Sequence, residues 1–167
     1  QTSDGSPDSE MAASLAAGAH PALIGLLGRL QQHPEGRAGL VLTRVGADWR
    51  NLAAPPSFAS CTRDVYAPEA CFDADTVRRI ATDIAAATAH LHAQGLGHGD
   101  LYAHNVLWRP AQGDAPDAPA RARPGDFGAA ACAPGALQPA LRALDALAFG
   151  RLLVGLLSRC AGAGGRP

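Results

Sequence analysis

The sequence contains no lysine, because all 14 of its basic side chains are arginine. Its 15 acidic residues leave a net charge of −1, which gives no electrostatic basis for nucleic acid or an anionic membrane surface as the main partner. Aromatic residues make up only 5% of the chain. No segment approaches the about 18 consecutive apolar residues of a transmembrane helix, and the polar, acidic start lacks the order of a secretion signal. We therefore expect no membrane-spanning segment.

Cysteine is also scarce, and Cys61, Cys71, Cys132 and Cys160 form no pair with the spacing of metal ligands. Reduced thiols in a cytoplasmic protein are the simplest interpretation of such spacing. With 167 residues, the chain is long enough for one domain or for the larger share of a two-lobed one.

The first part of the chain predicts one helix and two strands. Good helix formers fill Ser9–Ala19, and the His20-Pro21 step ends the helix because proline restricts the residue before it. Leu23–Leu30 and Ala38–Val45 are typical of apolar strands that could pair across a polar turn. Asp48–Ala70 has two adjacent prolines and little periodicity, which predicts an ordered but irregular connector.

Two longer helices are predicted further on. Asp73 or Asp75 can cap the first of them, and Gly95 suits the left-handed cap at its end. Its apolar stripe consists of Val77, Ile80, Ile84, Ala87 and Leu91. The second helix is predicted over Leu137–Arg159, and its apolar run indicates a helix buried on most faces. Its expected stripe consists of Leu141, Leu144, Ala148, Leu152 and Leu156. Residues 109–124 are typical of an exposed loop, and residues 161–167 of a disordered tail.

The chemistry lies in the segment HGDLYAHN, which begins at His98, and in the later segment GDFG. Asp100 and Asn105 fall between a helix and an apolar strand, where the carboxylate can accept a proton from an attacking hydroxyl and the amide oxygen can bind Mg²⁺. In the second segment, Asp126 could bridge Mg²⁺ to phosphates, and Gly128 permits a sharp turn. The pair of motifs therefore indicates phosphoryl transfer.

These motifs resemble the eukaryotic-type protein kinase family, whose catalytic loop reads His-Arg-Asp-Leu-x-x-x-x-Asn and whose metal loop reads Asp-Phe-Gly. HPALIGLLG resembles strand four of that family, GLVLTRV resembles strand five running into the hinge, and LDALAFGRLL resembles a later buried helix. The segments HGDLYAHN, GDFGAA and SCTRDVY are similar in sequence to segments of bacterial kinase domains that are attached to leucine-rich repeats. No such repeat lies in this chain.

The resemblance implies an α+β, protein-kinase-like fold that is mostly the helical C-lobe, with helix C and strands four and five of the N-lobe. Residues 1–47 would form the partial N-lobe and hinge, and residues 48–160 the C-lobe. The catalytic loop would span residues 98–107 and the metal loop residues 125–128. The glycine-rich loop and the ATP-anchoring lysine are expected upstream of Gln1.

The resemblance also implies ATP and Mg²⁺ as cofactors. Asp100 would be the catalytic base, and Asn105 and Asp126 the Mg²⁺ ligands. His98 is expected to hold the catalytic loop through hydrogen bonds, and Asp145 to anchor its backbone.

Five further residues would contact the nucleotide. Leu107 would lie under the adenine, and Leu42 would guard the back pocket. Thr43 and Val45 would offer hinge backbone hydrogen bonds to the base, and Glu10 is placed like the glutamate that pairs with the anchoring lysine.

The departures from the family pattern leave several functions open. Gly99 replaces the arginine that, in many protein kinases, pairs with the phosphate of a phosphorylated activation loop. The stretch from Gly128 to Asp145 is short and has no Ser, Thr or Tyr. The leading interpretation is an ATP- and Mg²⁺-dependent protein kinase, present here as an incomplete domain. A small-molecule phosphotransferase of the aminoglycoside or choline kinase type is favoured by Gly99 and the short stretch, whereas Phe127 speaks against it. A non-catalytic pseudokinase module is favoured by the missing lysine and by a weak strand sequence, ARARP, before Gly125.

Overall fold

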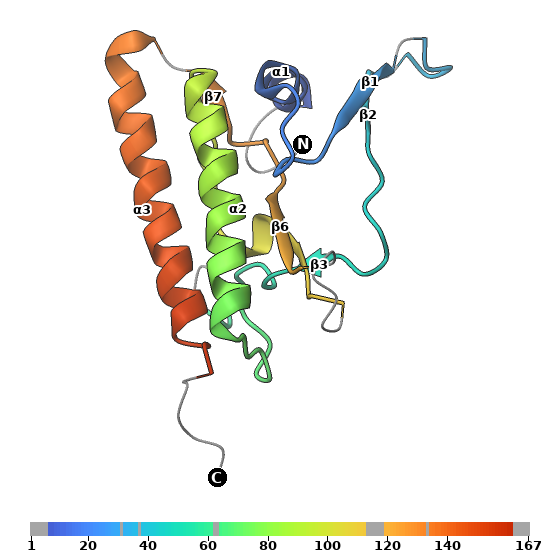
Figure 1. Cartoon of the computed structure of the whole chain (residues 1–167). Coiled ribbons are helices and arrows are strands. Elements are labelled where there is room, and N and C mark those ends of the chain that lie inside the picture. Colours follow the sequence, from blue (N-terminus) through green and yellow to red (C-terminus); the bar gives the residue numbers. More distant parts are fainter. Residues whose placement is uncertain are drawn as a thin grey trace.

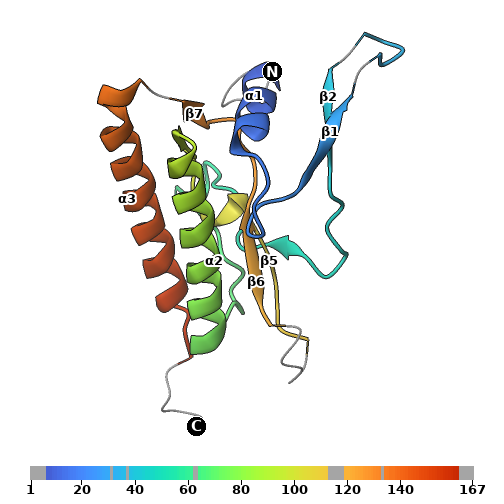
Figure 2. The same ribbon diagram turned by 45° about the horizontal axis from the view of Figure 1, so that its top comes forward.

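The computed structural model describes residues 7–30, 32–36, 38–61, 64–112, 119–132 and 134–161. The long helices α2 and α3 lie side by side, a small sheet covers α2, and a separate hairpin projects beyond α1 (Figure 1; Figure 2). The elements are α1 (Pro7–Ala17), β1 (Leu26–Leu30), β2 (Gly39–Leu42), β3 (Arg50–Asn51), α2 (Ala74–Ala93), β4 (Leu96–Gly97), the 3₁₀ turn η1 (Ala103–Asn105), β5 (Val106–Arg109), β6 (Arg121–Pro124), β7 (Ala131–Cys132), the 3₁₀ turn η2 (Gly135–Leu137) and α3 (Gln138–Leu157). The expected α+β architecture is confirmed.

The first part of the chain follows the prediction with shorter elements. α1 ends at Ala17, before Gly18, whose φ of +67° is a left-handed conformation that glycine adopts freely. β1 and β2 pair antiparallel, which confirms the predicted strand pair. β1 begins three residues later than expected because Leu23 is in a turn, where its N–H bonds the His20 oxygen and its side chain is buried.

Helix α2 matches its prediction closely. The Asp73 carboxylate accepts a hydrogen bond from the Thr76 N–H at 2.7 Å, and Gly95 has a φ of +76° just past the last turn. All five residues of the predicted stripe are buried. These features are local consequences of capping and helical periodicity, so the sequence suffices to specify them.

Two apolar clusters hold the elements together. The larger one joins α2, α3 and the three-stranded sheet, and includes Ile80, Ile84, Leu101, Val106, Trp108, Leu152 and Leu156. The smaller one joins α1 to the C-terminal half of α2 through Ala17, Leu23, Ala87, Leu91 and Leu96, with Phe127 packed against it. Fully burying an aliphatic side chain such as Leu101 contributes roughly 1.5–3 kcal/mol, so the larger cluster holds the loop after β4, to which Leu101 belongs, in place.

The prediction of a weak strand before Gly125, and of an exposed loop up to Pro124, is wrong for residues 121–124. All four residues of β6 pair with β5, in the sheet order β3-β5-β6. Ala122 and Pro124 are buried against α2, while Arg121 forms an ion pair with Asp83 at 2.9 Å. Asp83 also accepts the Ala122 N–H at 2.9 Å. These contacts from α2 override the poor strand propensity of the segment. Residues 113–118 of the predicted loop, and residues 162–167 of the predicted tail, lie outside the described residues.

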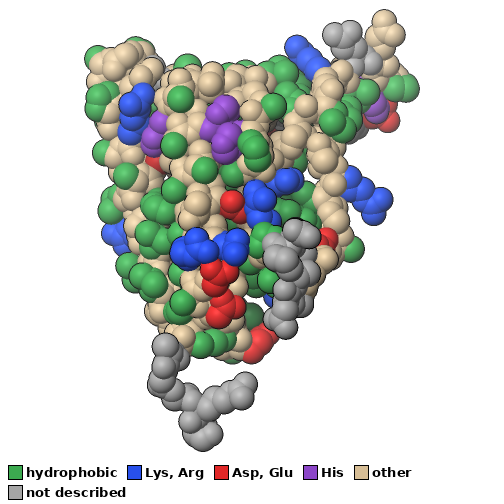
Figure 3. All heavy atoms as spheres, in the orientation of Figure 1, with side chains coloured by type: hydrophobic (Ala, Val, Ile, Leu, Met, Phe, Trp, Pro, Cys, Tyr) green, Lys and Arg blue, Asp and Glu red, His purple; other side chains and the backbone are tan. Residues whose placement is uncertain are grey.

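The prediction that the last helix is buried on most faces is also wrong. Leu144, Leu147, Val154 and Leu157 are each at least 58% exposed, and Figure 3 shows hydrophobic side chains along the outer surface of this region. The buried line runs through Asp145, Leu152 and Leu156 instead of Leu144, because only one face of α3 meets α2 and β4. No helix within the described residues is long and apolar enough to cross a bilayer.

Candidate active site

Asp100 and Asn105 lie together at the end of the loop that follows β4. The Asn105 side-chain Nδ2 donates to the Asp100 carboxylate at 2.7 Å and to the Asp100 backbone oxygen at 3.0 Å. The 3₁₀ turn η1 brings the two residues into contact, because the Asn105 N–H closes the turn on the Tyr102 oxygen. The Asn105 amide therefore restrains the orientation of the Asp100 carboxylate.

Asp126 lies in a loop bonded directly to the first one. The Gly125 N–H donates to the Asn105 oxygen at 2.8 Å, so the two predicted motifs meet through a backbone hydrogen bond. Asp126 has a φ of +55°, a conformation that aspartate tolerates better than most residues, and its Oδ1 accepts the Gly128 N–H at 3.0 Å. The turn thereby fixes the direction of the Asp126 carboxylate.

His98 joins the same two loops from the inside. Its ring is fully buried, with Nε2 3.1 Å from the Gly125 oxygen and the ring centroid 5.5 Å from that of Phe127. Burial lowers the pKa of His98 below its ordinary value, although nearby Asp145 and the bond to Gly125 oppose this shift. The predicted structural role of His98 is confirmed.

Asp145 is the predicted anchor of the catalytic-loop backbone, and its contacts confirm that role. The carboxylate is buried and accepts the backbone N–H groups of His98 at 2.8 Å and Gly99 at 3.0 Å. His92 Nε2 lies 2.8 Å from the same carboxylate. α3 therefore holds the start of the catalytic loop through one buried acidic side chain.

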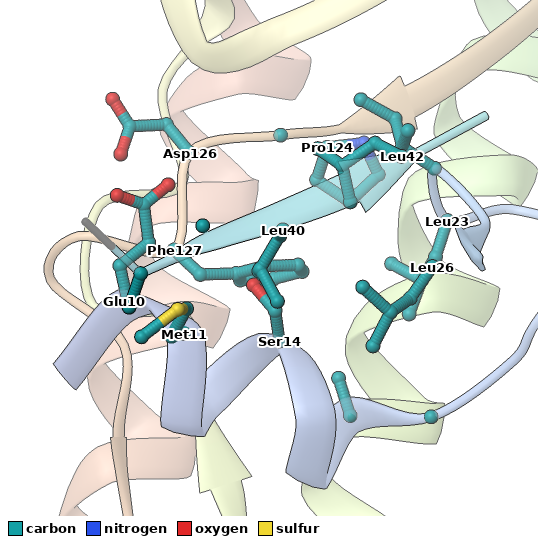
Figure 4. Close-up of a pocket in the computed structure, with 16 residues that line it drawn as sticks. Glu10, Met11, Ser14, Leu23, Leu26, Leu40, Leu42, Pro124, Asp126 and Phe127 are labelled. Atoms are coloured by element: carbon teal, nitrogen blue, oxygen red, sulfur yellow. The ribbon is translucent and has the colours of Figure 1, made fainter. Parts of the chain in front are cut away.

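A cavity of about 250 Å³ lies between α1, the β1–β2 hairpin and the loop of Asp126 (Figure 4). Glu10 and Asp126 line it on one side, where Figure 4 shows their carboxylates close together in the view, and Leu42 lines it near the other end. The remaining wall is mostly apolar, with the Phe127 ring extending across it. Three of the predicted site residues therefore share one cavity.

The other predicted nucleotide contacts lie outside this cavity wall. The Thr43 N–H is bonded to the Gly25 oxygen at 2.7 Å, so the backbone of Thr43 can offer a base only its carbonyl oxygen. Val45 is half-buried in the connector that follows β2. Leu107 is on β5, paired with Arg123 of β6, and the Arg123 guanidinium stacks 5.0 Å above the Trp49 ring. That stacking holds the connector after β2 to the sheet, and sequence reasoning missed it.

The donor atoms of the two loops fit a magnesium ion. Among the contacts of the described residues, both hydrogen bonds of the Asn105 amide use Nδ2 and the Asp126 bond to Gly128 uses Oδ1, which leaves one oxygen of each side chain for a cation. Mg²⁺ prefers such hard oxygen ligands and completes its shell with water and substrate phosphates. No three His, Cys, Asp or Glu side chains gather as a metal centre anywhere in the part of the chain that the structure describes, so a dedicated all-protein site is not supported there.

Gly99 has a steric reason to be glycine. Its φ is +78°, and a Cβ at this position would lie 2.4 Å from the Ala129 backbone oxygen. The arginine that protein kinases place here therefore cannot enter this loop conformation.

Gly99→Ala is expected to lower the free energy of unfolding by at least about 1–2 kcal/mol, because left-handed backbone strain adds to the clash with Ala129. Chemical denaturation measures the change. Gly150→Ala is the matched control: it lies inside α3 with open space around its Cβ, so it should stabilise by about 0.5–1 kcal/mol. Equal stability of the Gly99→Ala variant and the wild type would contradict this account of the loop.

One further residue of the site was missed from sequence. Asp64, in the irregular connector, accepts hydrogen bonds from both the backbone and the ring of His104. An aspartate in a polar connector has no spacing signal that would link it to a loop 40 residues away.

Comparison with known proteins matches about half of the chain to a family. Residues 34–119, about half of the chain, match the lipopolysaccharide kinase (Kdo/WaaP) family. Among solved structures, the chain is similar to one described as the crystal structure of Rad53 kinase domain and SCD2, with 19% identity and a TM-score of 0.64. The match covers 97% of this chain and 56% of that one, so this chain spans little more than half the length of the solved structure. No curated protein matches the chain.

The likeness to the solved kinase domain, at this low identity, establishes the fold alone. The predicted protein-kinase-like fold, present as a partial domain, is thereby confirmed. The chain belongs to the lipopolysaccharide kinase (Kdo/WaaP) family of kinase-like phosphotransferases.

Proposed function

We propose that the protein containing this chain transfers the γ-phosphoryl group of ATP to a hydroxyl group, with Mg²⁺ as cofactor. The observation that carries the proposal is the hydrogen bonding that joins the two motifs: the Asn105 amide donates to the Asp100 carboxylate, and the Gly125 N–H, next to Asp126, donates to the Asn105 backbone oxygen. Family membership supports the reaction class. Residues 1–47 would contribute the N-lobe part of the site, and residues 48–160 the C-lobe part.

In the proposed reaction, the Asp100 carboxylate accepts the proton of the acceptor hydroxyl. The oxygen of that hydroxyl bonds to the γ-phosphorus. The bond from the γ-phosphorus to the β,γ-bridging oxygen breaks, and ADP leaves. Asn105 and Asp126 would hold the Mg²⁺, which offsets the charge of the phosphates when it is bound. Leu42, Thr43, Val45 and Leu107 would contact the adenine.

Glu10 would pair with the ATP-anchoring lysine, which is not among the 167 residues. Its place in the wall of the cavity that Asp126 also lines suits that role. We also propose that the protein acts in the cytoplasm, because its four cysteines have the spacing of reduced thiols. The similarity of its motifs to kinase domains attached to leucine-rich repeats supports a leucine-rich-repeat domain as a further partner.

We propose that the acceptor is a hydroxyl group of a carbohydrate or of another non-peptide molecule. A protein hydroxyl is the less favoured alternative. The matched family is named for lipopolysaccharide kinases. The chain between Gly128 and Asp145 is too short for an ordinary peptide-binding platform, and Gly99 has no room for a phosphate-reading arginine. The Asp-Phe-Gly sequence around Phe127 favours a protein acceptor, which is the second candidate.

The acceptor class is tested by incubating the full-length protein with Mg·ATP and either a bacterial lipopolysaccharide core or a mixed protein substrate, followed by mass spectrometry. We expect an added phosphate on the carbohydrate, and loss of the product in Asp100→Asn, which removes the proton acceptor while keeping the side-chain shape. Phosphorylated protein with unmodified carbohydrate would move the acceptor to the second candidate. Product formation at the wild-type rate by Asp100→Asn would refute the role of Asp100.

A further inference from the structure

His104 is held at four points by residues that the mechanism above does not use. Its backbone N–H and its ring Nδ1 each lie 2.9 Å from Asp64 Oδ1. Its backbone oxygen accepts a hydrogen bond from the Asn51 side chain at 3.0 Å, and the Tyr102 ring stacks on its ring at 5.9 Å between centroids. Asn51 and Asp64 both belong to the connector between the β1–β2 hairpin and α2. Two residues of this distant connector therefore bind one residue of the catalytic loop.

The bond between Asp64 and the His104 ring fixes the orientation of that ring. A carboxylate only accepts hydrogen bonds, so His104 Nδ1 carries the proton in this contact. The two side chains are only 16% and 13% exposed, and a charge-assisted hydrogen bond in such a site is stronger than a neutral one. With Nδ1 held by Asp64, the other ring nitrogen faces Asp100, at 4.0 Å from its Oδ2.

His104 also determines where Asn105 lies. Both residues are in the single 3₁₀ turn η1, and Asn105 is the donor to the Asp100 carboxylate. A rotation of this turn would move the amide away from Asp100 and the amide oxygen away from the cation it is proposed to bind. The contacts of Asp64 and Asn51 with His104 therefore act on the turn that sets the relative position of Asp100 and Asn105.

We propose that His104, oriented by Asp64, is a positioning residue that sets the geometry of Asp100 and Asn105 for phosphoryl transfer. This inference rests on the proposed function of these two residues. Displacement of reacting groups by about 1 Å can cost on the order of 100-fold in rate. Displacement of Asn105 would also weaken the proposed hold on Mg²⁺, but Asp126 and the adenine contacts remain, so the loss of His104 should lower kcat more than it raises the KM for ATP.

The test compares three variants in the full-length protein with Mg·ATP, following ADP release. His104→Ala should lower kcat by about 10- to 100-fold and raise the KM for ATP by a smaller factor. His104→Asn places an amide N–H where Nδ1 was and should restore kcat to within about threefold of wild type, whereas His104→Gln places it at the Nε2 end and should behave like alanine. His33→Ala, in the turn between β1 and β2, is the control and should match wild type.

Asp64→Ala tests the pair. If Asp64 acts through His104, the double variant Asp64→Ala/His104→Ala should be no slower than the slower single variant. Multiplicative effects on kcat, a wild-type kcat for His104→Ala, or equal values for the Asn and Gln variants would overturn the inference. Asp100→Asn separates this result from failure of the proposed function: wild-type turnover in that variant refutes the function, whereas its loss beside a fully active His104→Ala refutes only the role of His104. Thermal unfolding of His104→Asn checks that the comparison is made on folded protein.

Discussion

Replacing Asp145 with alanine is expected to lower the free energy of unfolding by about 3–5 kcal/mol, the largest stability loss of any single change considered for this chain. The carboxylate is 1% exposed and accepts hydrogen bonds from two backbone N–H groups, those of His98 and Gly99. Alanine would leave the buried N–H of His98 and the partly buried N–H of Gly99 without this partner, and an unpaired buried group costs about 1–3 kcal/mol. It would also release His92, which bonds the same carboxylate from α2.

Urea denaturation followed by circular dichroism measures this loss. Asp145→Asn keeps one oxygen acceptor but turns an N–H₂ group toward a site filled with donors, so its loss should be smaller than that of alanine and still measurable. Asp75→Ala is the matched control: its carboxylate is exposed and bonds only Arg78 and Arg79 on the same helix, among the described contacts, so little change is expected. An Asp145→Ala loss below about 1 kcal/mol would contradict the anchoring role.

Replacing Asp126 with asparagine is expected to lower kcat/KM for ATP by on the order of 10²–10³-fold. Asparagine tolerates the left-handed backbone at this position and its oxygen can still accept the Gly128 N–H. The loop should therefore keep its shape while losing the negative charge that is proposed to hold Mg²⁺. This separation of shape from charge makes asparagine more informative than alanine.

Steady-state kinetics at several Mg²⁺ concentrations provide the measurement. The variant should require more Mg²⁺ for half-maximal activity, because the ligand that remains at this position is neutral. Asp75→Asn removes a surface carboxylate of α2 and should leave the kinetics unchanged. Wild-type kcat/KM and Mg²⁺ dependence in Asp126→Asn would remove this residue from the metal site.

The parts of the fold that sequence could predict are those with local physical causes. α2 is the clearest case, since Asp73, the apolar stripe and Gly95 each act within a few residues. The fold class could be predicted from the order of the two phosphotransfer motifs, HGDLYAHN followed by GDFG, because that order is specific to the protein-kinase-like fold. The contacts of His98 and Asp145 were also expected from the motif resemblance.

The parts that sequence could not predict depend on distant contacts. β6 has poor strand propensity, and Asp83 of α2 supplies the partner that stabilises it. The apolar character of α3 says nothing about which face meets α2, so Leu144 was placed on the wrong side. The Asp64 contact to His104 joins two loops whose approach is set only by the packed core. Gly99 was understood as the loss of an arginine, whereas its Cβ position shows that the backbone of Ala129 excludes any side chain.

The most direct test of the central claim, that Asp100, Asn105 and Asp126 form a Mg²⁺-dependent nucleotide site, is calorimetric titration of the full-length protein with ATP. The titration is made with Mg²⁺ and again with EDTA, for the wild type and for Asp126→Asn. The account predicts that the wild type binds ATP much more tightly with Mg²⁺ than with EDTA, and that the variant loses most of this difference. Equal ATP affinity with Mg²⁺ and with EDTA in the wild-type protein would contradict it.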